Sequence, residues 1–281
     1  MVMTQDADHG DPGRAATIPI ALTIAGSDSS GGAGIQADLK TFAAFGVYGA
    51  SVITALTAQN TRGVSGIHQV PSEFVTAQID AVFGDLRVDA VKIGMVAQPS
   101  TIEAIVAGIA RWSPRNVVLD PVMVATSGDR LLAPDAVRAL RTKLMPRASL
   151  ITPNLPEAAA LLDEPLAESP AAIESQGKRL LALGCPAVLI KGGHALGAES
   201  VDYLVRDRGV IALPAPRIAT RNTHGTGCSL SSAIAAELAT GQEMETAVRN
   251  AKAWLTAAIA AADRLRVGQG HGPVHHFHRF Y

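Results

Sequence analysis

Short apolar runs alternate with longer amphipathic stretches through most of the chain. Apolar runs of strand length fall at residues 20–25, 50–56, 90–93, 116–119, 150–152 and 187–190. Between them, apolar residues recur every three or four positions, which predicts helices over 35–43, 72–83, 100–110, 134–144, 155–162 and 171–183. Parallel strands joined by helical crossovers produce this alternation, so the pattern predicts an α/β fold with a mostly parallel central sheet.

The pattern changes after residue 200. Two short strands at 201–205 and 210–213 predict an antiparallel edge, and further helices are expected behind Cys228 and over 244–262. No internal repeat and no flexible linker divides the chain, so residues 18–281 are predicted to form one three-layer α/β/α domain. Residues 1–17 are polar and lack the apolar segment of a secretory signal, which indicates a disordered N-terminal tail.

Composition narrows the class of partner. Of the 281 residues, 48% are hydrophobic and 17% charged, and the net charge is −1, so we expect neither a nucleic-acid binder nor a membrane-surface protein. Cys185 and Cys228 do not make a disulfide framework, and no apolar run reaches the roughly 20 residues that cross a bilayer. We therefore expect a cytoplasmic protein whose partner is a small molecule.

Polar or flexible residues stand where the predicted strands end. In a parallel sheet, ligands bind beyond the carboxyl ends of the strands, so residues at these ends are expected to share one site. The residues at the six strand ends are Asp28, Gln59, Gly94, Asp120, Asn154 and Lys191.

The stretch TRNTHGTGCSLSSAI, residues 220–234, combines two glycines, a thiol and the start of an apolar helix. Gly225 and Gly227 leave backbone N–H groups uncovered, and the start of a helix favours an anion. Cys228 falls in the first turn, where the helix dipole is expected to lower its thiol pKa and make it a candidate proton acceptor. The alternative is a small apolar cysteine that only packs at the base of the helix.

The glycine-rich segment GSDSSGGAG, residues 26–34, suggests a phosphate or substrate loop. It lacks both the Lys-Ser or Lys-Thr pair of a P-loop and the spacing of a dinucleotide fold, so a flexible turn is equally compatible with it. Asp38 follows in the first turns of the next helix. Its carboxylate could face a substrate hydroxyl or simply complement the helix dipole.

Three further strand-end positions have two interpretations each. The amide of Gln59 offers a donor and an acceptor that complement an aminopyrimidine edge, although a surface glutamine is the ordinary alternative. Asn154 and Glu157 have the spacing of a capping box, or could hold Mg²⁺ through water. Lys191 could neutralise a transferring phosphoryl group or be a solvated lysine.

Several histidines lie outside these motifs. His194 and the loop after it could form a flap or an ordinary turn. The C-terminal histidines have no cysteine or paired carboxylate beside them, so packing or a subunit contact is favoured over a metal site. They are His271, His275, His276 and His278.

Taken together, the motifs resemble one enzyme family along the chain from about Ile20 to the carboxyl end. They are AGSDSSGGAGIQADLKTFAAFG, TALTAQNTRGV, VKIGM, VLDPVM, LITPNLPEA, VLIKGGH, NTHGTGCSLSSAIAA and GPVHHFH. This ordered set closely resembles the hydroxymethylpyrimidine and phosphomethylpyrimidine kinases of thiamine biosynthesis, which have the ribokinase-like fold. The resemblance implies ATP- and Mg²⁺-dependent phosphorylation of 4-amino-5-hydroxymethyl-2-methylpyrimidine and then of its monophosphate, by a homodimer.

The resemblance also implies roles for individual residues. Gln59 would read the aminopyrimidine, Asp38 would make a second polar contact, and Met95 and Val122 would wall the ring. The phosphates and Mg²⁺ would be served by Lys191, Asn154 and Glu157, with Asp120 as a further candidate. The anion hole for the transferring phosphoryl group would consist of the amides of Gly225, Thr226, Gly227 and Cys228.

Cys228 departs from the general ribokinase-like pattern, in which an aspartate ends the GxGD motif and takes the substrate hydroxyl proton. A cysteine there is typical of the hydroxymethylpyrimidine branch. The second acceptor is already an anionic phosphate, so Cys228 should matter more for the first transfer. The rival hypotheses are a pyridoxal-type kinase on the same fold and, less favoured, a non-catalytic pyrimidine sensor; the glycine pattern argues against a nicotinamide oxidoreductase.

Overall fold

The computed structural model describes residues 18–123, 132–193 and 197–281. The predicted tail over 1–17 and the interpretation of His194 lie outside these residues. None of the described helices combines the length and apolar composition needed to cross a membrane.

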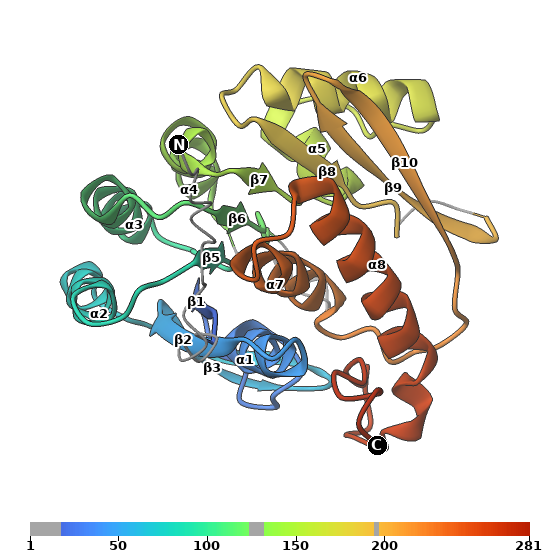
Figure 1. Cartoon of the computed structure of the whole chain (residues 1–281), viewed down its shortest axis with the longest axis horizontal. Helices are drawn as coiled ribbons and strands as arrows, with labels where there is room; N and C mark the ends of the chain where they lie inside the picture. The colour runs from blue at the N-terminus through green and yellow to red at the C-terminus, as the bar shows by residue number, and fades with distance from the viewer. Residues whose placement is uncertain (1–17, 124–131, 194–196) are drawn as a thin grey trace, which may run out of the picture.

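An eight-stranded sheet forms the centre of the molecule (Figure 1), with the strand order β10-β9-β8-β7-β6-β5-β1-β2. Each neighbouring pair is parallel except the two pairs made by β9, which runs against both β8 and β10. This confirms the parallel sheet and its antiparallel edge. The strands are β1 (Ile20–Ala25), β2 (Tyr48–Ile53), β5 (Ala90–Ile93), β6 (Val117–Leu119), β7 (Leu150–Ile151), β8 (Ala187–Ile190), β9 (Glu199–Arg206) and β10 (Gly209–Pro216).

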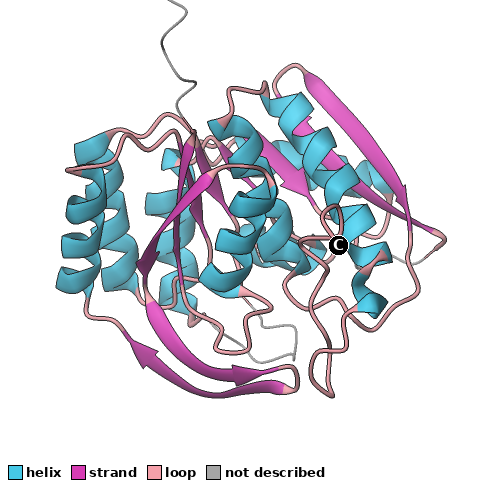
Figure 2. Ribbon diagram, turned by 60° about the horizontal axis from the view of Figure 1, so that its bottom comes forward, coloured by secondary structure: helices cyan, strands magenta, loops and turns pink. Residues whose placement is uncertain are grey.

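Helices cover both faces of this sheet, which gives the three layers that the sequence predicts (Figures 1 and 2). One face packs against α1 (Gly34–Ala44), α7 (Thr226–Ala239) and α8 (Met244–Ala260). The other packs against α2 (Ser72–Phe83), α3 (Pro99–Trp112), α4 (Pro134–Ala139), α5 (Leu155–Leu162) and α6 (Pro170–Leu181).

Alternation along the strands divides the core into two clusters. In β1, Leu22 and Ile24 join the cluster on the α2–α6 face, whereas Ala21 joins the cluster on the α7 face. Successive side chains of a strand point to opposite faces, so a strand covered by helices on both sides is apolar throughout. This explains why the strands read as continuous apolar runs.

The predicted strand over 50–56 is wrong in its second half. Strand β2 ends at Ile53, and Leu56 belongs to β3 (Ala55–Asn60), which pairs with β4 (Gly63–Gln69) in a separate antiparallel sheet (Figure 2). The chain turns at Thr54, whose N–H bonds Ala25 O and whose hydroxyl bonds Met95 O. The first bond is the last rung of the β1–β2 ladder, and the second ties the turn to the segment after β5; local apolar character alone reveals neither.

Two predicted helices also differ at their ends. The helix predicted over 134–144 is α-helical only to Ala139 and continues as a π-helical turn, Leu140–Leu144. The last helix ends at Ala260, and a 3-10 turn follows at Ala262–Arg264.

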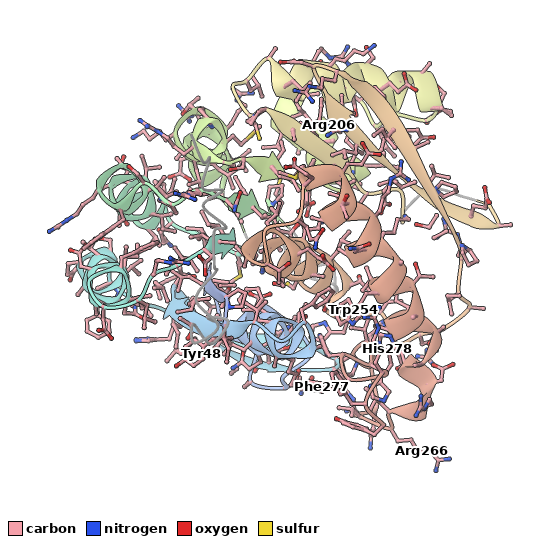
Figure 3. The ribbon with its side chains drawn as sticks, in the orientation of Figure 1. Tyr48, Arg206, Trp254, Arg266, Phe277 and His278 are labelled. Carbon is pink, nitrogen blue, oxygen red and sulfur yellow. The ribbon has the colours of Figure 1, made fainter. Side chains whose placement is uncertain are left out.

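Three of the four C-terminal histidines, His275, His276 and His278, pack against α7 and α8, whereas His271 is exposed and lies against the Arg221 carbonyl. His276 is buried and lies 2.9 Å from the Ser229 hydroxyl, while His278 lies 5.9 Å from the ring of Trp254 (Figure 3). Burial lowers the pKa of His276 to about 3, so this ring is neutral. The described residues contain no group of three histidine, cysteine or acidic side chains placed to hold a metal ion. Packing therefore accounts for the two buried histidines of this segment, His275 and His276.

Candidate active site

A cavity of about 750 Å³ opens at the carboxyl ends of the parallel strands. It gathers five of the six predicted strand-end residues, Asp28, Gln59, Asp120, Asn154 and Lys191; Gly94 is not part of its wall. Cys228 and both glycines of the GTGC turn also line it. The predicted site residues therefore converge on one cavity although they come from separate strands.

Asp28 organises the loop between β1 and α1. Its carboxylate accepts hydrogen bonds from the N–H groups of Ser30, Gly32 and Ala33 and from the Ser30 hydroxyl. His224, which immediately precedes the GTGC turn, lies 2.8 Å from the same carboxylate. Burial works to raise the pKa of Asp28, but these hydrogen bonds outweigh it and hold the pKa well below its ordinary value. A permanently ionised aspartate thus ties the glycine-rich loop to the anion-binding turn.

The two loops also meet backbone to backbone. Gly225 has φ +77°, and a Cβ there would lie 1.9 Å from the carbonyl oxygen of Gly32. Both the conformation and the contact require glycine. Gly225 is the N-cap of α7, so this contact fixes the start of the helix against the glycine-rich loop.

Cys228 lies in the first turn of α7 and is partly exposed to the cavity. The predicted low pKa of its thiol is wrong: burial raises that pKa to about 11. The Lys92 ammonium opposes the rise, whereas the carboxylates of Asp38 and Asp120 reinforce it. Desolvation therefore outweighs the helix start, and the ligand-free protein holds a neutral thiol.

A buried charge network lies beside the GTGC turn. Lys191 Nζ is 2.7 Å from Asp120 Oδ1 and 3.8 Å from Glu157 Oε2, and Thr152 donates a 3.0 Å hydrogen bond to Asp120. Burial works to lower the pKa of Lys191, but the Asp120 and Glu157 charges outweigh it and raise that pKa. Lys191 is thus a fixed cation, and a Cβ on Gly227 would lie 3.4 Å from its ammonium.

Asn154 and Glu157 form the capping box of α5. The Glu157 N–H donates to Asn154 Oδ1 at 2.8 Å, and the Asn154 N–H donates to Glu157 Oε2 at 2.7 Å. The structural interpretation of this pair is therefore correct, yet both side chains also line the cavity. Burial raises the pKa of Glu157 to about 7 despite the nearby Lys191 charge.

Gln59 reaches the cavity from the two-stranded sheet. Alternation along β3 turns Thr57 and Gln59 toward the cavity, and the Thr57 hydroxyl donates to Gln59 Oε1 at 3.1 Å. The Ser29 hydroxyl donates to the Gln59 carbonyl at 2.8 Å, so strand and loop are joined. Met95 and Val122 line the same end of the cavity and give it an apolar wall.

Comparison with known proteins identifies the family. A model of the phosphomethylpyrimidine kinase family matches residues 28–275, from the aspartate of the glycine-rich loop to the C-terminal histidines. The chain belongs to this family. A member from Salmonella typhimurium, hydroxymethylpyrimidine/phosphomethylpyrimidine kinase, is 57% identical over 261 residues, which are 93% of this chain and 98% of that protein. The chain is therefore an enzyme, and its class is kinase.

Solved structures agree with this family and with the ribokinase-like fold. Phosphomethylpyrimidine kinase from Clostridium difficile superposes with a TM-score of 0.77 at 46% identity, covering 86% of this chain and all of that one. An ADP complex of pyridoxal kinase from Bacillus subtilis gives a TM-score of 0.87 at 37% identity, covering 94% and 100%.

Asp38 is placed differently from its predicted substrate contact. Its side chain is fully buried beneath the cavity and pairs with Lys92 at 2.9 Å. The interior holds this carboxylate because Lys92, Thr23 and Ser232 all donate to it, so a substrate contact is not its role in this structure.

Lys92 and His224 are among the residues of the site that escaped the sequence analysis. Lys92 is a charged residue inside the otherwise apolar four-residue strand β5. Because buried charged residues are almost always paired, this position could have predicted a buried partner of opposite charge. His224 stands next to the GTGC turn, but its partner Asp28 is 196 residues away. No local pattern reveals that pair.

The cavity wall also includes a set of apolar residues and one further buried ion pair. Lys252 Nζ lies 2.7 Å from Asp202 Oδ2, and Asp202 Oδ1 accepts the N–H of Gly192 at 2.8 Å. The apolar wall consists of Ala215, Pro216, Ile218, Leu255 and Ile259. Asp202 thereby fixes the turn that carries Lys191.

Proposed function

We propose that this kinase transfers the γ-phosphoryl group of ATP to 4-amino-5-hydroxymethyl-2-methylpyrimidine, and then a second phosphoryl group to the monophosphate. The observation that carries the proposal is the single cavity that joins Gln59 at one end to the Lys191 cation and the GTGC turn. One site for both transfers is economical, because the monophosphate places its phosphate where the alcohol stood.

The polar groups of the cavity support a division of roles. The Gln59 amide pairs with the aminopyrimidine edge while Met95 and Val122 enclose the ring. The N–H groups of the Gly225–Cys228 turn, with Lys191, stabilise charge on the transferring phosphoryl group. For the first transfer, the Cys228 sulfur in its deprotonated form takes the hydroxyl proton; the second acceptor needs no base.

The residues around Glu157 fit a Mg²⁺ ion held largely through water. Mg²⁺ prefers oxygen ligands, takes few carboxylates and keeps several waters. Glu157 is a buried carboxyl whose pKa is raised to about 7, so it gains from a nearby cation, and Asn154 adds an amide oxygen. When bound with ATP, the ion would neutralise phosphate charge. The apolar wall with Leu255 and Ile259 suits the adenine ring.

A product assay with the pyrimidine alcohol, ATP and Mg²⁺ tests the proposal directly. Both monophosphate and diphosphate should appear, and binding without ADP release would instead support a sensor. Cys228→Ala, measured with each acceptor separately, should slow the first transfer by about 10²-fold or more and the second far less. Equal losses would favour simple shaping of the site. Cys185→Ala is the matched control, since this buried thiol lies in the core.

A second candidate activity is the phosphorylation of pyridoxal. It is favoured by the fold match to the pyridoxal kinase from Bacillus subtilis, whose name states that activity. Both substrates present a hydroxymethyl group on a heteroaromatic ring. The ratio of kcat/KM for the two alcohols under identical ATP and Mg²⁺ decides between them, and a ratio above one for pyridoxal would reverse the main proposal.

The proposal includes a homodimer. The register of β3 and β4 places Leu56 and Ile67 on opposite faces of the two-stranded sheet, and they are 47% and 44% exposed. Such a small sheet with apolar side chains on both faces is marginal in water unless it is covered. Leu56→Glu combined with Ile67→Glu should give a monomer in sedimentation, whereas Leu166→Glu, at a 50% exposed leucine outside this sheet, should not.

A cytoplasmic location is likewise proposed. Cys185 and Cys228 are both free thiols, as expected of a protein kept in a reducing compartment. Fractionation of cells that express the full chain tests this.

A further inference from the structure

A fully buried polar cluster lies in the core between the sheet and α7. Thr23 on β1 and Lys92 on β5 are register partners on adjacent strands, and both point to the α7 face. Asp38 from α1 and Ser232 from α7 complete the cluster, and all four residues are 0% exposed. Charged residues are almost never buried in this way unless they are paired, so the cluster requires an explanation.

The hydrogen bonds of the cluster converge on the Asp38 carboxylate. Lys92 Nζ lies 2.9 Å from each carboxylate oxygen, the Thr23 hydroxyl donates at 2.6 Å, and the Ser232 hydroxyl donates at 2.7 Å. Among the described residues, Asp38 is the one hydrogen-bond partner of the Lys92 ammonium. Burial works to lower the pKa of Lys92, but the Asp38 charge outweighs it and raises that pKa, so the ammonium is permanently charged.

The cluster lies directly beneath Cys228. Ser232 follows Cys228 by one turn of α7, which places both on the same side of the helix. Lys92 belongs to the cavity wall together with Cys228, and a Cβ on Gly94 would lie 2.7 Å from its ammonium, so glycine leaves the space that the charge occupies. The Lys92 ammonium is also the largest charge opposing the effect of burial on the Cys228 pKa.

We propose that Lys92, held by Asp38, is a positioning residue that stabilises the anionic form of the Cys228 sulfur during the first phosphoryl transfer. This inference rests on the proposed function, because it assumes an alcohol acceptor. Four charged side chains act on the sulfur: Lys92 from β5, Asp38 from α1, Asp120 after β6 and Lys191 after β8. Lys92 has the strongest attraction for the thiolate, and its effect exceeds that of its partner Asp38.

The step balances without a further reactant. The neutral Cys228 thiol first releases its proton to solvent, and the resulting thiolate takes the proton of the hydroxymethyl group, which breaks the O–H bond and forms S–H. The alcohol oxygen forms a bond to the γ-phosphorus of ATP, and the bond from that phosphorus to the β–γ bridging oxygen breaks, so ADP leaves with the electron pair. Lys92 exchanges no proton and touches no reacting atom.

The test replaces the buried pair by neutral residues of similar size, Lys92→Met with Asp38→Asn in one protein. Changing both avoids an uncompensated buried charge, and a thermal melt checks the fold. The rate of Cys228 alkylation by iodoacetamide is measured against pH without substrate, nucleotide or Mg²⁺, and mass spectrometry of tryptic peptides separates Cys228 from Cys185. Cys185 serves as the internal reference in the same sample.

Lys92 and Asp38 act on the Cys228 thiolate in opposite directions, and the attraction by Lys92 is the larger of the two. Removing both charges should therefore lower the alkylation rate of Cys228 at about pH 8.5 by about tenfold, equivalent to one pKa unit. The Cys185 rate should be unchanged. Thr23→Val, which removes a hydrogen bond to Asp38 but no charge, should leave both rates within about twofold of wild type. The double variant should also slow monophosphate formation more than diphosphate formation.

The possible results separate this inference from the proposed function. An unchanged or faster Cys228 alkylation in the double variant overturns the role of Lys92, even if both products form normally. A Thr23→Val protein that shows the same tenfold fall also overturns it, because hydrogen bonding rather than charge would then be the cause. A wild-type protein that forms no monophosphate overturns the proposed function and the transfer step with it.

Discussion

Gly225 offers a sharp test of the contact between the glycine-rich loop and the anion-binding turn. Substituting alanine has two consequences. The residue must keep a positive φ, +77°, and its new Cβ must avoid the Gly32 carbonyl oxygen, which would lie only 1.9 Å away. Gly241, at the other end of α7, provides a matched control: its φ is +88°, but a Cβ there meets nothing within 4 Å.

The structure sets the expected magnitudes. The left-handed conformation costs an alanine about 1 kcal/mol at either position, which corresponds to a fall in Tm of about 2 °C. At Gly225, atoms at 1.9 Å must also move apart by about 1 Å, and overpacking of this kind costs about 1–3 kcal/mol more. A displacement of about 1 Å at the anion-binding turn should reduce kcat by about 10²-fold.

Two measurements check this expectation, a thermal melt and the rate of ADP formation with saturating pyrimidine alcohol. Gly241→Ala should lose about 2 °C in Tm and keep wild-type kcat, because only the backbone conformation is strained. Gly225→Ala should lose more in the melt and about 10²-fold in kcat. A Gly225→Ala enzyme that melts like Gly241→Ala and keeps kcat within about threefold would refute the idea that this contact positions the turn.

Three further predictions concern charge and space at the cavity. The Asp28 pKa lies below its ordinary value, so the ionised carboxylate stabilises the folded state fully above about pH 4, and this stabilisation is lost as pH falls. In urea melts, Asp28→Asn should be about 2 kcal/mol less stable than wild type at pH 7, and the difference in stability should shrink in acid. The Glu157 pKa is raised to about 7, so ionising this carboxyl costs folding stability as pH rises from 4.5. In urea melts without Mg²⁺, Glu157→Gln, which keeps the capping box, should gain on wild type by roughly 3 kcal/mol across that window, and parallel pH profiles would contradict this. A Cβ on Gly192 would lie 1.8 Å from the Val201 carbonyl oxygen, whereas one on Gly193 meets no atom of the described residues within 4 Å. Gly192→Ala should therefore lower Tm by about 5 °C or more and Gly193→Ala by about 1 °C or less; equal melts would exclude the contact.

The sequence by itself determined the architecture and most of the polar residues that the site brings together. Apolar residues recur with different periods in strands and in helices, so short stretches of sequence are enough to predict the alternation of elements. Helices α2 and α5 occupy the predicted residues 72–83 and 155–162. A parallel sheet brings the carboxyl ends of its strands to one edge, and this places Asp28, Asp120 and Lys191 in one cavity without any knowledge of contacts.

Only the tertiary structure decided the electrostatics of the site. Asp38 faces Lys92 in the core, and His224 meets Asp28 across 196 residues of sequence. The thiol of Cys228 is less acidic than its helix position predicts, because burial outweighs the helix start. The physical reason is that desolvation and Coulomb energy depend on distances in space, and the sequence spacing of these residues contains no record of those distances.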